Sequence, residues 1–522
     1  MQLGFVLDMT RCIGCHACTV ACKSENDVPL GDYRTWVKYT EQGAFPDVKR
    51  SFTVLRCNQC TDAPCVEICP VTALDKRPDG IVDVDHRICI GCKACMQGCP
   101  YDALYLNEDS GTAQKCHFCA HRTEQGLAPA CAVVCPTEAI VPGDFDDAGS
   151  TVARMRHDFD LQVRKPEAGT GPNVYYREAS PDGLEPGRTN AAGGYLWSQQ
   201  QQGPRLDAQL FEAFERKAQA PSTQPGGRTV YDVDRQPHWG GFITGYLFFK
   251  SLAAGTFLAG MLLLSPSGLG GAAAGEALRA PLAVPALSLL FLTITLVLLV
   301  ADLKRPERFL SILLRPNWNS WLAKGSYILL GYSLALTAWT LLGWVEREAT
   351  GFLGWNLLAV TAVLAGGSAA YTALLFNQAK GRVLWMKRGY ALHLLIQAVV
   401  AGSAVLLLCS GWMGLADQAR VALGDLLIGS LLGHLVFTLA EGKLAPRGRE
   451  AEFHRAARLV THGPWAKLHW TGGVVLGIAV PVALLFVSAT GALAVVAALF
   501  ALGGLWVEKD TFVRAGQALP IS

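Results

Sequence analysis

The stretch CIGCHACTVAC at residues 12–22 places four cysteines in the spacing C-x2-C-x2-C-x3-C. The stretch CIGCKACMQGC at residues 89–99 repeats that spacing. Thiolates two residues apart lie on one tight loop, so three of them can bind three corners of a cubane iron–sulfur cluster, while the remote fourth cysteine caps a different cluster. The repeat therefore predicts a domain built around metal-bound cysteines rather than a large apolar core.

Two further groups of four cysteines extend this pattern. Residues 57–69 carry the spacing C-x2-C-x4-C-x3-C, and at residues 116–135 eleven residues replace the middle gap. Three of the four groups end in the Cys-Pro pair of bacterial ferredoxin-type motifs, whereas Lys23 follows the last cysteine of the first group. Sixteen cysteines supply four [4Fe-4S] clusters with no ligand missing. The predicted metal ligands are Cys12, Cys15, Cys18, Cys22, Cys57, Cys60, Cys65, Cys69, Cys89, Cys92, Cys95, Cys99, Cys116, Cys119, Cys131 and Cys135.

Zinc sites and disulfides explain these cysteines less well. A structural zinc site takes four ligands in two separated pairs rather than three in a run. A disulfide framework belongs to small exported domains, whereas MQLGFVLDMTR at residues 1–11 has neither the basic nor the apolar region of a secretory signal. We therefore expect no such signal. The seventeenth cysteine, Cys409, lies in an apolar segment and is expected to be an ordinary core residue.

The composition divides the chain into two unlike halves. Of its 522 residues, 51% are hydrophobic and only 17% are charged, against about 25% charged residues in average soluble domains. The sixteen clustered cysteines end at Cys135, and the long apolar runs begin after Gly240. A net charge of +2 gives no electrostatic case for nucleic-acid binding, which would need a concentrated basic surface. We expect a soluble cysteine-rich half followed by a membrane-embedded half.

The second half contains eight apolar spans. About 20 apolar residues cross a hydrocarbon core of about 30 Å, and most of the spans reach that length. The last two are short and lie close together, so seven spans is an alternative, and a buried soluble bundle is the other. The spans are 241–264, 281–301, 325–344, 353–376, 390–410, 422–440, 470–487 and 491–507.

We therefore predict a two-part fold. An N-terminal α+β domain of the double bis-[4Fe-4S] ferredoxin type precedes an all-α polytopic membrane bundle of about eight helices. Between them lies a connector rich in Gly, Pro, Ser and Gln, in which residues 206–217 have the apolar spacing of a docking helix. The expected boundaries are 1–160 for the cluster domain, 161–236 for the connector, 237–510 for the membrane domain and 511–522 for the tail.

The loops between the spans are asymmetric in charge. Those after the second, fourth and sixth spans carry 14 Lys and Arg residues, and the opposite loops carry only Arg279, Arg347 and Arg420. The positive-inside rule places the basic side in the cytoplasm, together with both termini and the cysteine-rich domain. The chain is then a multi-pass protein of the cell (inner) membrane. The competing explanation is that these basic residues dock a protein partner.

The cysteine pattern of about the first 160 residues resembles the four-cluster electron-transfer subunits of the dimethyl-sulfoxide and polysulfide reductase type. This resemblance implies that each cluster takes cysteines from two groups, and that the last of the clusters named below lies nearest the membrane. The implied sets are Cys12, Cys15, Cys18 with Cys135; Cys22 with Cys116, Cys119, Cys131; Cys57, Cys60, Cys65 with Cys99; and Cys69 with Cys89, Cys92, Cys95.

Residues from about 235 to 510 resemble the NrfD-like membrane subunits of polysulfide reductases. The segments that carry this resemblance are HWGGFITGYLFFKSLAAGTFLAG at 238–260, DLKRPERFLSILLRPNWNSW at 302–321, YTALLFNQAKGRVLW at 371–385 and RAARLVTHGPWAKLHW at 455–470. The resemblance implies eight helices, no haem, and exchange of electrons with a quinone.

Polar side chains gather at the ends of the spans that face the cysteine-rich domain. A quinone head group needs a hydrogen-bond donor and a proton carrier, and these residues supply both. Each also has a structural explanation: an interfacial aromatic anchor, a loop ion pair, a buried polar contact or, for Lys250, a side chain that snorkels to the membrane surface. The candidates are His238, Trp239, Lys250, Asp302, Arg305, Tyr371, His393 and His434.

These patterns together predict an electron-transfer and membrane-anchor subunit. It would carry electrons between a menaquinone or ubiquinone pool and a separate molybdopterin (molybdenum or tungsten) catalytic subunit, without itself acting on the terminal substrate. Two alternatives remain open at this stage. One is a cytochrome b-type anchor with His393 and His434 as haem ligands, and the other is a proton-translocating module of a larger respiratory complex.

Overall fold

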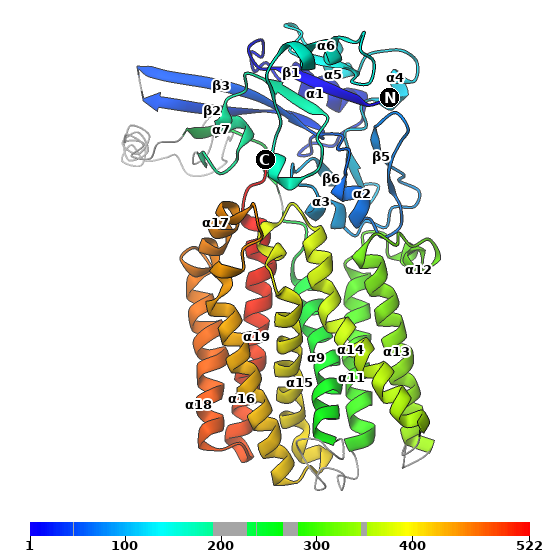
Figure 1. Ribbon diagram of the computed structural model, residues 1–522, viewed down its shortest axis with the longest axis vertical. Coiled ribbons are helices and arrows are strands. Elements are labelled where there is room, and N and C mark those ends of the chain that lie inside the picture. Colours follow the sequence, from blue (N-terminus) through cyan, green and yellow to red (C-terminus); the bar gives the residue numbers. More distant parts are fainter. Residues whose placement is uncertain (45, 192–226, 236, 265–279, 346–351) are drawn as a thin grey trace, which may run out of the picture.

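The computed structural model describes residues 1–44, 46–191, 227–235, 237–264, 280–345 and 352–522. A domain of short strands and helices lies on one end of a bundle of long helices (Figure 1). The C-terminus returns to the junction between these two parts. The two-part fold predicted from the sequence is confirmed, with an α+β ferredoxin-type domain followed by an all-α bundle.

Two four-stranded sheets and two hairpins organise the cysteine-rich domain. In the first sheet β1 (Leu3–Asp8) pairs antiparallel with β8 (Ile140–Asp144) and parallel with β10 (Val174–Arg177), which pairs with β9 (Leu161–Gln162). The second sheet has the order β11 (Asn190–Ala191), β12 (Arg228–Tyr231), β2 (Thr35–Ala44), β3 (Asp47–Arg56). The hairpins are β4 (Leu74–Lys76) with β5 (Val82–Val84), and β6 (Leu104–Asn107) with β7 (Thr112–Lys115).

Short helices begin within or beside the cysteine groups. The two repeats share one backbone conformation, because Gly14 and Gly91 have φ of 72° and 67°, and His16 and Lys93 have φ of 60° and 62°. Glycine adopts this left-handed region without steric cost, so the turn brings its cysteines together before the helix starts. The helices are α1 (Ala17–Glu25), α2 (Pro64–Ile68), α3 (Ala94–Gly98), α4 (Ala120–Thr123), α5 (Ala130–Val133), α6 (Thr151–Asp158) and α7 (Pro181–Leu184), with the 3-10 turn η1 (Pro166–Ala168).

Part of the expected connector belongs to the sheets. Strands β9, β10 and β11 fall between residues 161 and 191, and β12 pairs with β2 just before the first long helix. Of these strands, β10 pairs directly with β1, and its side chains Val174 and Tyr176 are fully buried. The docking helix expected at 206–217 lies outside the described residues.

Eight helices are long and apolar enough to cross a membrane within the described ranges. They agree with the eight predicted spans, and the last helix runs eleven residues beyond its predicted end. They are α9 (Gly241–Leu264), α11 (Ala280–Ala301), α13 (Trp321–Val345), α14 (Phe352–Gln378), α15 (Tyr390–Met413), α16 (Asp417–Leu439), the π-helical η5 (Leu468–Ala479) continued by α18 (Val480–Val487), and α19 (Gly491–Ala518).

The helix α9 lies at the centre of the bundle. It is the most buried of the eight spans, and it packs against α11, α14, α15 and α19. Shorter elements on the side of the cysteine-rich domain join the long helices. These are η2 (Pro306–Arg308), α12 (Ser311–Leu314), η3 (Val383–Met386), η4 (Glu441–Leu444) and α17 (Glu450–Thr461).

Candidate functional site

Two small cavities collect the cysteines of the two central groups. One cavity is lined by Cys57, Cys60 and Cys65 from the second group and by Cys99 from the third. The other is lined by Cys69 from the second group together with Cys89, Cys92 and Cys95. Each cavity therefore takes three cysteines from one group and the last cysteine of its neighbour.

The outer two groups interleave in a similar way. The thiol of Cys12 is close enough to those of Cys15 and Cys135 for their charges to interact. The thiol of Cys22 is similarly close to those of Cys116, Cys119 and Cys131. The amide nitrogen of Asn26 lies 3.7 Å from the sulfur of Cys22 and 3.9 Å from that of Cys119, which places these two thiols side by side.

The surroundings of these cysteines fit iron–sulfur clusters. Burial raises the pKa of Cys18 and of Cys99 to about 11, so their thiolates need a positive partner such as iron. Hydrogen-bond donors also point at the sulfurs: Arg56 Nη2 donates to Cys131 Sγ at 2.9 Å, and the Ala139 N–H donates to Cys135 Sγ at 3.2 Å. Such donors stabilise the charge of cluster-bound sulfur.

The membrane half contacts the central groups directly. Asn317 Nδ2 donates to the carbonyl oxygen of Cys69 at 2.8 Å, and Arg308 Nη1 donates to that of Cys89 at 2.9 Å. The N–H of Gly381 donates to the Gln97 carbonyl at 3.0 Å. In Figure 1, α2 and α3 accordingly lie against the bundle, whereas α1, α4 and α5 lie on the far side of the domain. The central cysteine groups are therefore the ones nearest the membrane helices.

A cavity of about 310 Å³ lies where the third cysteine group meets the membrane helices. It is bounded by residues of α9, α11, α12, α13 and α14, and its wall is mostly apolar. Such a shape and lining are typical of sites for small apolar ligands with a few polar groups. The polar or sulfur-bearing residues of the wall are Cys92, Tyr246, Asp302, Ser326, Ser333 and Tyr371, and Trp239 and Phe376 add aromatic rings.

The tyrosine hydroxyls of this wall belong to a buried polar chain. The hydroxyls of Tyr246 and Tyr371 are 2.5 Å apart, and that of Tyr246 lies 2.8 Å from the hydroxyl of Thr372. Lys250 donates to the same Thr372 hydroxyl, and its ammonium lies 4.5 Å from the centre of the Tyr371 ring. Lys250 is 1% exposed, so its side chain does not extend to the membrane surface.

Asp302 and Arg305 connect the two halves of the molecule. Asp302 lines the cavity and forms an ion pair of 2.8 Å with Lys93, which follows Cys92 in the chain. Burial raises the pKa of Asp302, and Lys93 partly opposes this effect. Arg305 Nε donates to the Ser110 carbonyl at 2.7 Å, away from the residues that line the cavity. Asp302 thus forms its ion pair across the two domains, whereas Arg305 forms one within its own loop, with Glu307 at 3.5 Å.

His238 and Trp239 have different surroundings although they are neighbours. Trp239 lines the cavity, and its indole N–H donates to the Cys92 carbonyl at 3.3 Å. His238 does not line it, and burial lowers the pKa of His238 to about 4. His238 is therefore neutral near pH 7. Its backbone N–H donates to Gln517 Oε1 at 3.0 Å, which secures the start of α9 to the end of α19.

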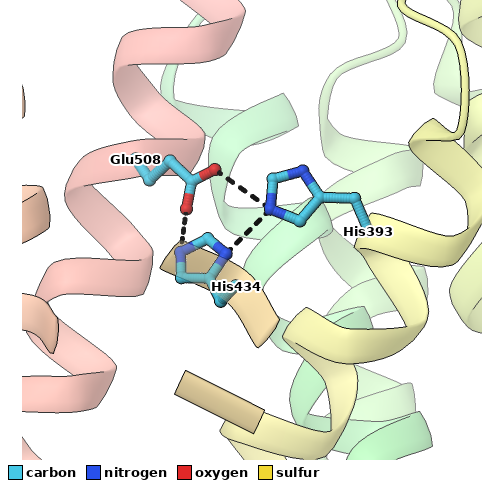
Figure 2. A group of neighbouring side chains, drawn as sticks. All are labelled: His393, His434 and Glu508. Carbon is cyan, nitrogen blue, oxygen red and sulfur yellow. Dashed lines mark hydrogen bonds and ion pairs between the residues drawn. The ribbon is translucent and has the colours of Figure 1, made fainter. Parts of the chain in front are cut away.

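His393 and His434 lie away from the cavity and contact each other. Figure 2 shows Glu508 of α19 pointing toward both imidazoles, His393 on α15 and His434 on α16. Glu508 was not among the residues predicted from the sequence, because the charged run EKD at 508–510 lowers the hydropathy and ended the predicted span at 507. Tyr246 and Thr372 were not predicted as site residues either. Tyr246 shares one helical stripe with Trp239 and Lys250 by spacings of seven and four residues, which is the signal that could have found it, whereas Thr372 had only its position within an apolar span.

The fold and the site define a class of protein: an iron–sulfur domain fused to a polytopic membrane domain. Residues 48–145 match the family described as "4Fe-4S dicluster domain", and residues 230–520 match the family described as "Polysulphide reductase, NrfD". The second match covers more than half of the sequence. The protein therefore belongs to the NrfD family of polysulphide reductase proteins, with an iron–sulfur domain in the same polypeptide.

Curated relatives match about a third of this chain. A tetrathionate reductase subunit of Salmonella typhimurium is 45% identical over 34% of this chain and 72% of its own length. The arsenate respiratory reductase iron-sulfur subunit ArrB of a Shewanella species is 36% identical over 34% of this chain and 96% of its own length. A polysulfide reductase subunit of Wolinella succinogenes is 37% identical over 35% of this chain and 98% of its own length.

Proposed function

We propose that the chain transfers electrons between a membrane quinone, bound in the cavity beside Cys92, and a catalytic subunit on the far side of the cysteine-rich domain. One observation carries this proposal: Cys92, Tyr246 and Tyr371 line the same cavity. A cluster ligand and two hydrogen-bond donors thereby lie next to one apolar space. Electron transfer between a quinone and a cluster requires that proximity.

The chain's own residues can bind the quinone and orient it. The apolar wall from α11 and α13 suits a quinone ring and the start of its isoprenoid tail. The hydroxyls of Tyr246 and Tyr371 can donate to a quinone carbonyl or accept from a quinol hydroxyl. Trp239, stacked on Trp385 with ring centres 5.4 Å apart, forms part of the cavity wall next to Cys92.

Four [4Fe-4S] clusters with the mixed ligand sets inferred from the family resemblance form the rest of the proposed route. Bound clusters supply one-electron carriers in a row. The shared lining of the two central cavities supports two of the ligand sets, and the neighbours of Cys12 and Cys22 support the other two. The outer groups face away from the membrane helices (Figure 1), toward where a partner would dock.

The catalytic partner we propose is a separate molybdopterin-containing subunit. The relatives are named as subunits of reductases for tetrathionate, arsenate and polysulfide, so the terminal substrate would be an oxidised sulfur or arsenic compound or a related acceptor. In this arrangement the chain performs the quinone half-reaction and leaves the terminal reaction to its partner.

We place the cysteine-rich domain on the cytoplasmic side. The excess of Lys and Arg on the loops of that side supports this orientation. Some of those residues also dock the cysteine-rich domain: Lys304, Arg305, Arg308, Arg382 and Arg455 bond to its residues. The proposed orientation therefore rests on the remaining Lys and Arg residues of these loops. Protease cleavage of the cysteine-rich domain in inside-out but not in right-side-out vesicles would support it, and the reverse would contradict it.

The quinone reaction can be tested on the full chain in detergent. The clusters are reconstituted anaerobically, reduced with dithionite and freed of excess reductant, and the protein is then mixed with menadione or decylubiquinone. We expect quinone-dependent return of the visible absorbance of oxidised clusters, with quinol formed in proportion. Clusters that stay reduced with both quinones would contradict the proposed function.

A further inference from the structure

Two buried histidines and one partly buried carboxylate form a cluster in the second half of the membrane domain, on α15, α16 and α19. His393 Nε2 lies 2.7 Å from His434 Nδ1, and His434 Nε2 lies 2.5 Å from a carboxylate oxygen of Glu508. His393 is fully buried, His434 is 5% exposed, and the side chain of Glu508 is 16% exposed. Ionisable groups inside a membrane domain are costly and therefore mark functional sites.

The hydrogen bonds of this cluster allow a proton to move without any change of fold. If His434 donates through Nε2 to Glu508, its Nδ1 accepts from His393, and Nδ1 of His393 is left with a free lone pair. A proton added there can shift through both rings, which makes each ring in turn the cation beside Glu508. In the part of the chain that is described, His393 Nδ1 has no hydrogen-bond partner, so it can receive that proton.

The charges around the cluster favour a proton over a metal ion. Glu508 supplies the only carboxylate of the cluster, and ammonium groups approach it from two other positions in the fold. A divalent ion would add two positive charges to this region, whereas a proton adds one. The titratable groups that face the cluster from the elements packed around it are Lys387, Tyr390, Glu441, His469 and Lys509.

Polar contacts lead from the cluster toward the cavity. Gln397 Nε2 donates to Glu508 Oε1 at 3.0 Å, and Lys509 Nζ donates to Gln397 Oε1 at 2.7 Å. Lys509 lies on α19, which packs against α9, the helix that carries Lys250. Lys250 in turn bonds to Thr372, which belongs to the chain of hydroxyls in the cavity wall. On its other side, the cluster faces the Lys387–Glu441 ion pair of 3.1 Å, in the loops next to the cysteine-rich domain.

We propose that His393, His434 and Glu508 form a proton-exchange site that connects the quinone cavity with the solution on the side of the cysteine-rich domain. This inference rests on the proposed quinone reaction and adds its proton route. Each quinone that takes two electrons from reduced clusters also takes up two protons to become quinol. The site passes these protons from the Lys387–Glu441 region through Glu508 toward Lys250, and in the reverse reaction it passes them outward.

The test uses the full chain in proteoliposomes, with reduced clusters and menadione as the oxidant. The orientation of the protein is measured by protease cleavage of the cysteine-rich domain. A pH-indicator dye, either outside or enclosed, reports on which side protons disappear while absorbance follows cluster oxidation. We expect proton uptake on the side that carries the cysteine-rich domain. Uptake from the opposite side would overturn the proposal.

Substitutions at Glu508 separate a proton route from a structural role. We expect Glu508→Gln to slow quinone-dependent cluster oxidation about tenfold, a modest loss compared with direct acid–base catalysis, and more strongly as pH rises. Glu508→Asp should restore most of the rate. The matched control is Asp425→Asn, which removes an exposed carboxylate from α16, and it should leave rate and pH profile unchanged.

The outcomes distinguish this inference from the proposed function. If wild-type clusters are not oxidised by quinone, the proposed function fails. If they are oxidised and Glu508→Gln has the wild-type rate at every pH, only the proton route fails. The last measurement is the metal content of the protein. One equivalent of zinc or copper per chain in the wild type, lost in His434→Asn, would show a metal site instead and overturn the proposal.

Discussion

The two halves of the membrane domain contain different kinds of site. The helices α9, α11, α13 and α14 bound an apolar cavity that reaches Cys92. The helices α15, α16 and α19 instead hold the cluster of His393, His434 and Glu508, in which both histidines are buried. The central helix α9 contacts both halves, so Lys250 on α9 lies between the two sites.

This difference separates two physical requirements of quinone chemistry. A quinone ring needs an apolar space beside an electron carrier, and a charged cluster inside that space would cost desolvation energy. Protons need groups that change charge near neutral pH, such as histidine beside a carboxylate. Placing these requirements in adjacent helix groups satisfies both. Changes in the cavity and changes outside it should therefore have separable effects.

Loss of Cys92 should have the largest effect on the electron transfer at the cavity. Cys92→Ser removes a proposed cluster ligand that also lines the cavity, so we expect the iron of one cluster to be lost and quinone-dependent oxidation to be abolished. The matched control is Cys409→Ser in α15, the seventeenth cysteine, which should keep its full iron content. Iron analysis and electron paramagnetic resonance of the reduced protein measure both variants. Retention of all cluster signals in Cys92→Ser would contradict the ligand assignment.

Loss of a cavity hydroxyl should weaken quinone binding without loss of iron. Removing one hydrogen bond of about 1–1.5 kcal/mol corresponds to roughly tenfold, so Tyr371→Phe and Tyr246→Phe should each raise the KM for menadione about tenfold. Tyr332→Phe is the control, because that buried hydroxyl bonds to the Ala253 carbonyl and does not line the cavity. Stopped-flow rates at varied quinone concentration give the KM values. Equal effects from all three variants would indicate a general packing defect.

The loop between α14 and η3, which contacts the cysteine-rich domain, should be sensitive to a single added methyl group. A Cβ on Gly381 would lie 2.4 Å from the Cys99 carbonyl oxygen and 2.7 Å from that of Gln97. Gly381→Ala should therefore push the loop from the cysteine-rich domain and slow electron transfer several-fold. Gly240→Ala, where nothing lies within 4 Å of the added Cβ, is the control. In the Gly381→Ala variant, protease should cleave the segment between the two domains faster, alongside the slower electron transfer. Equal cleavage of both variants would argue against a close contact of this loop with the cysteine-rich domain.

The smallest effect concerns stability below neutral pH. Burial lowers the pKa of His238 from its ordinary value near 6.5 to about 4. Between these values the unfolded protein binds a proton that the folded protein does not, so the free energy of unfolding falls as pH drops from 6.5 to 4, by at most about 1.4 kcal/mol per pH unit.

The substitution His238→Gln removes this proton-binding group while leaving the backbone hydrogen bond to Gln517. Thermal unfolding followed by tryptophan fluorescence should show that the variant loses less stability than the wild type between pH 6.5 and 4. At pH 7.5 the two proteins should differ by the same amount as at pH 7, because His238 is neutral at both. Parallel pH curves throughout would show that His238 does not contribute to the acid sensitivity.

The architecture could be predicted from the sequence because its signals are local. Cysteine spacing is set by the reach of a tight loop around a cubane, and helix spans are set by the thickness of a bilayer. All eight spans were predicted, and three of the candidate residues, Trp239, Asp302 and Tyr371, line the cavity. The hydropathy windows ended the last span before Glu508, since a charged run lowers the hydropathy average even when the helix continues to Ala518.

The kind of chemistry follows from local patterns in the chain: sixteen cysteines in cluster spacing and apolar runs long enough for a membrane-spanning bundle. Which residues meet depends on the folded chain. Asp302 pairs with Lys93 across 209 positions, and the Tyr246 hydroxyl meets that of Tyr371 across 125. Glu508 joins two histidines from other helices. No local pattern encodes such contacts, because they depend on how whole helices pack and on which buried charges must find partners there.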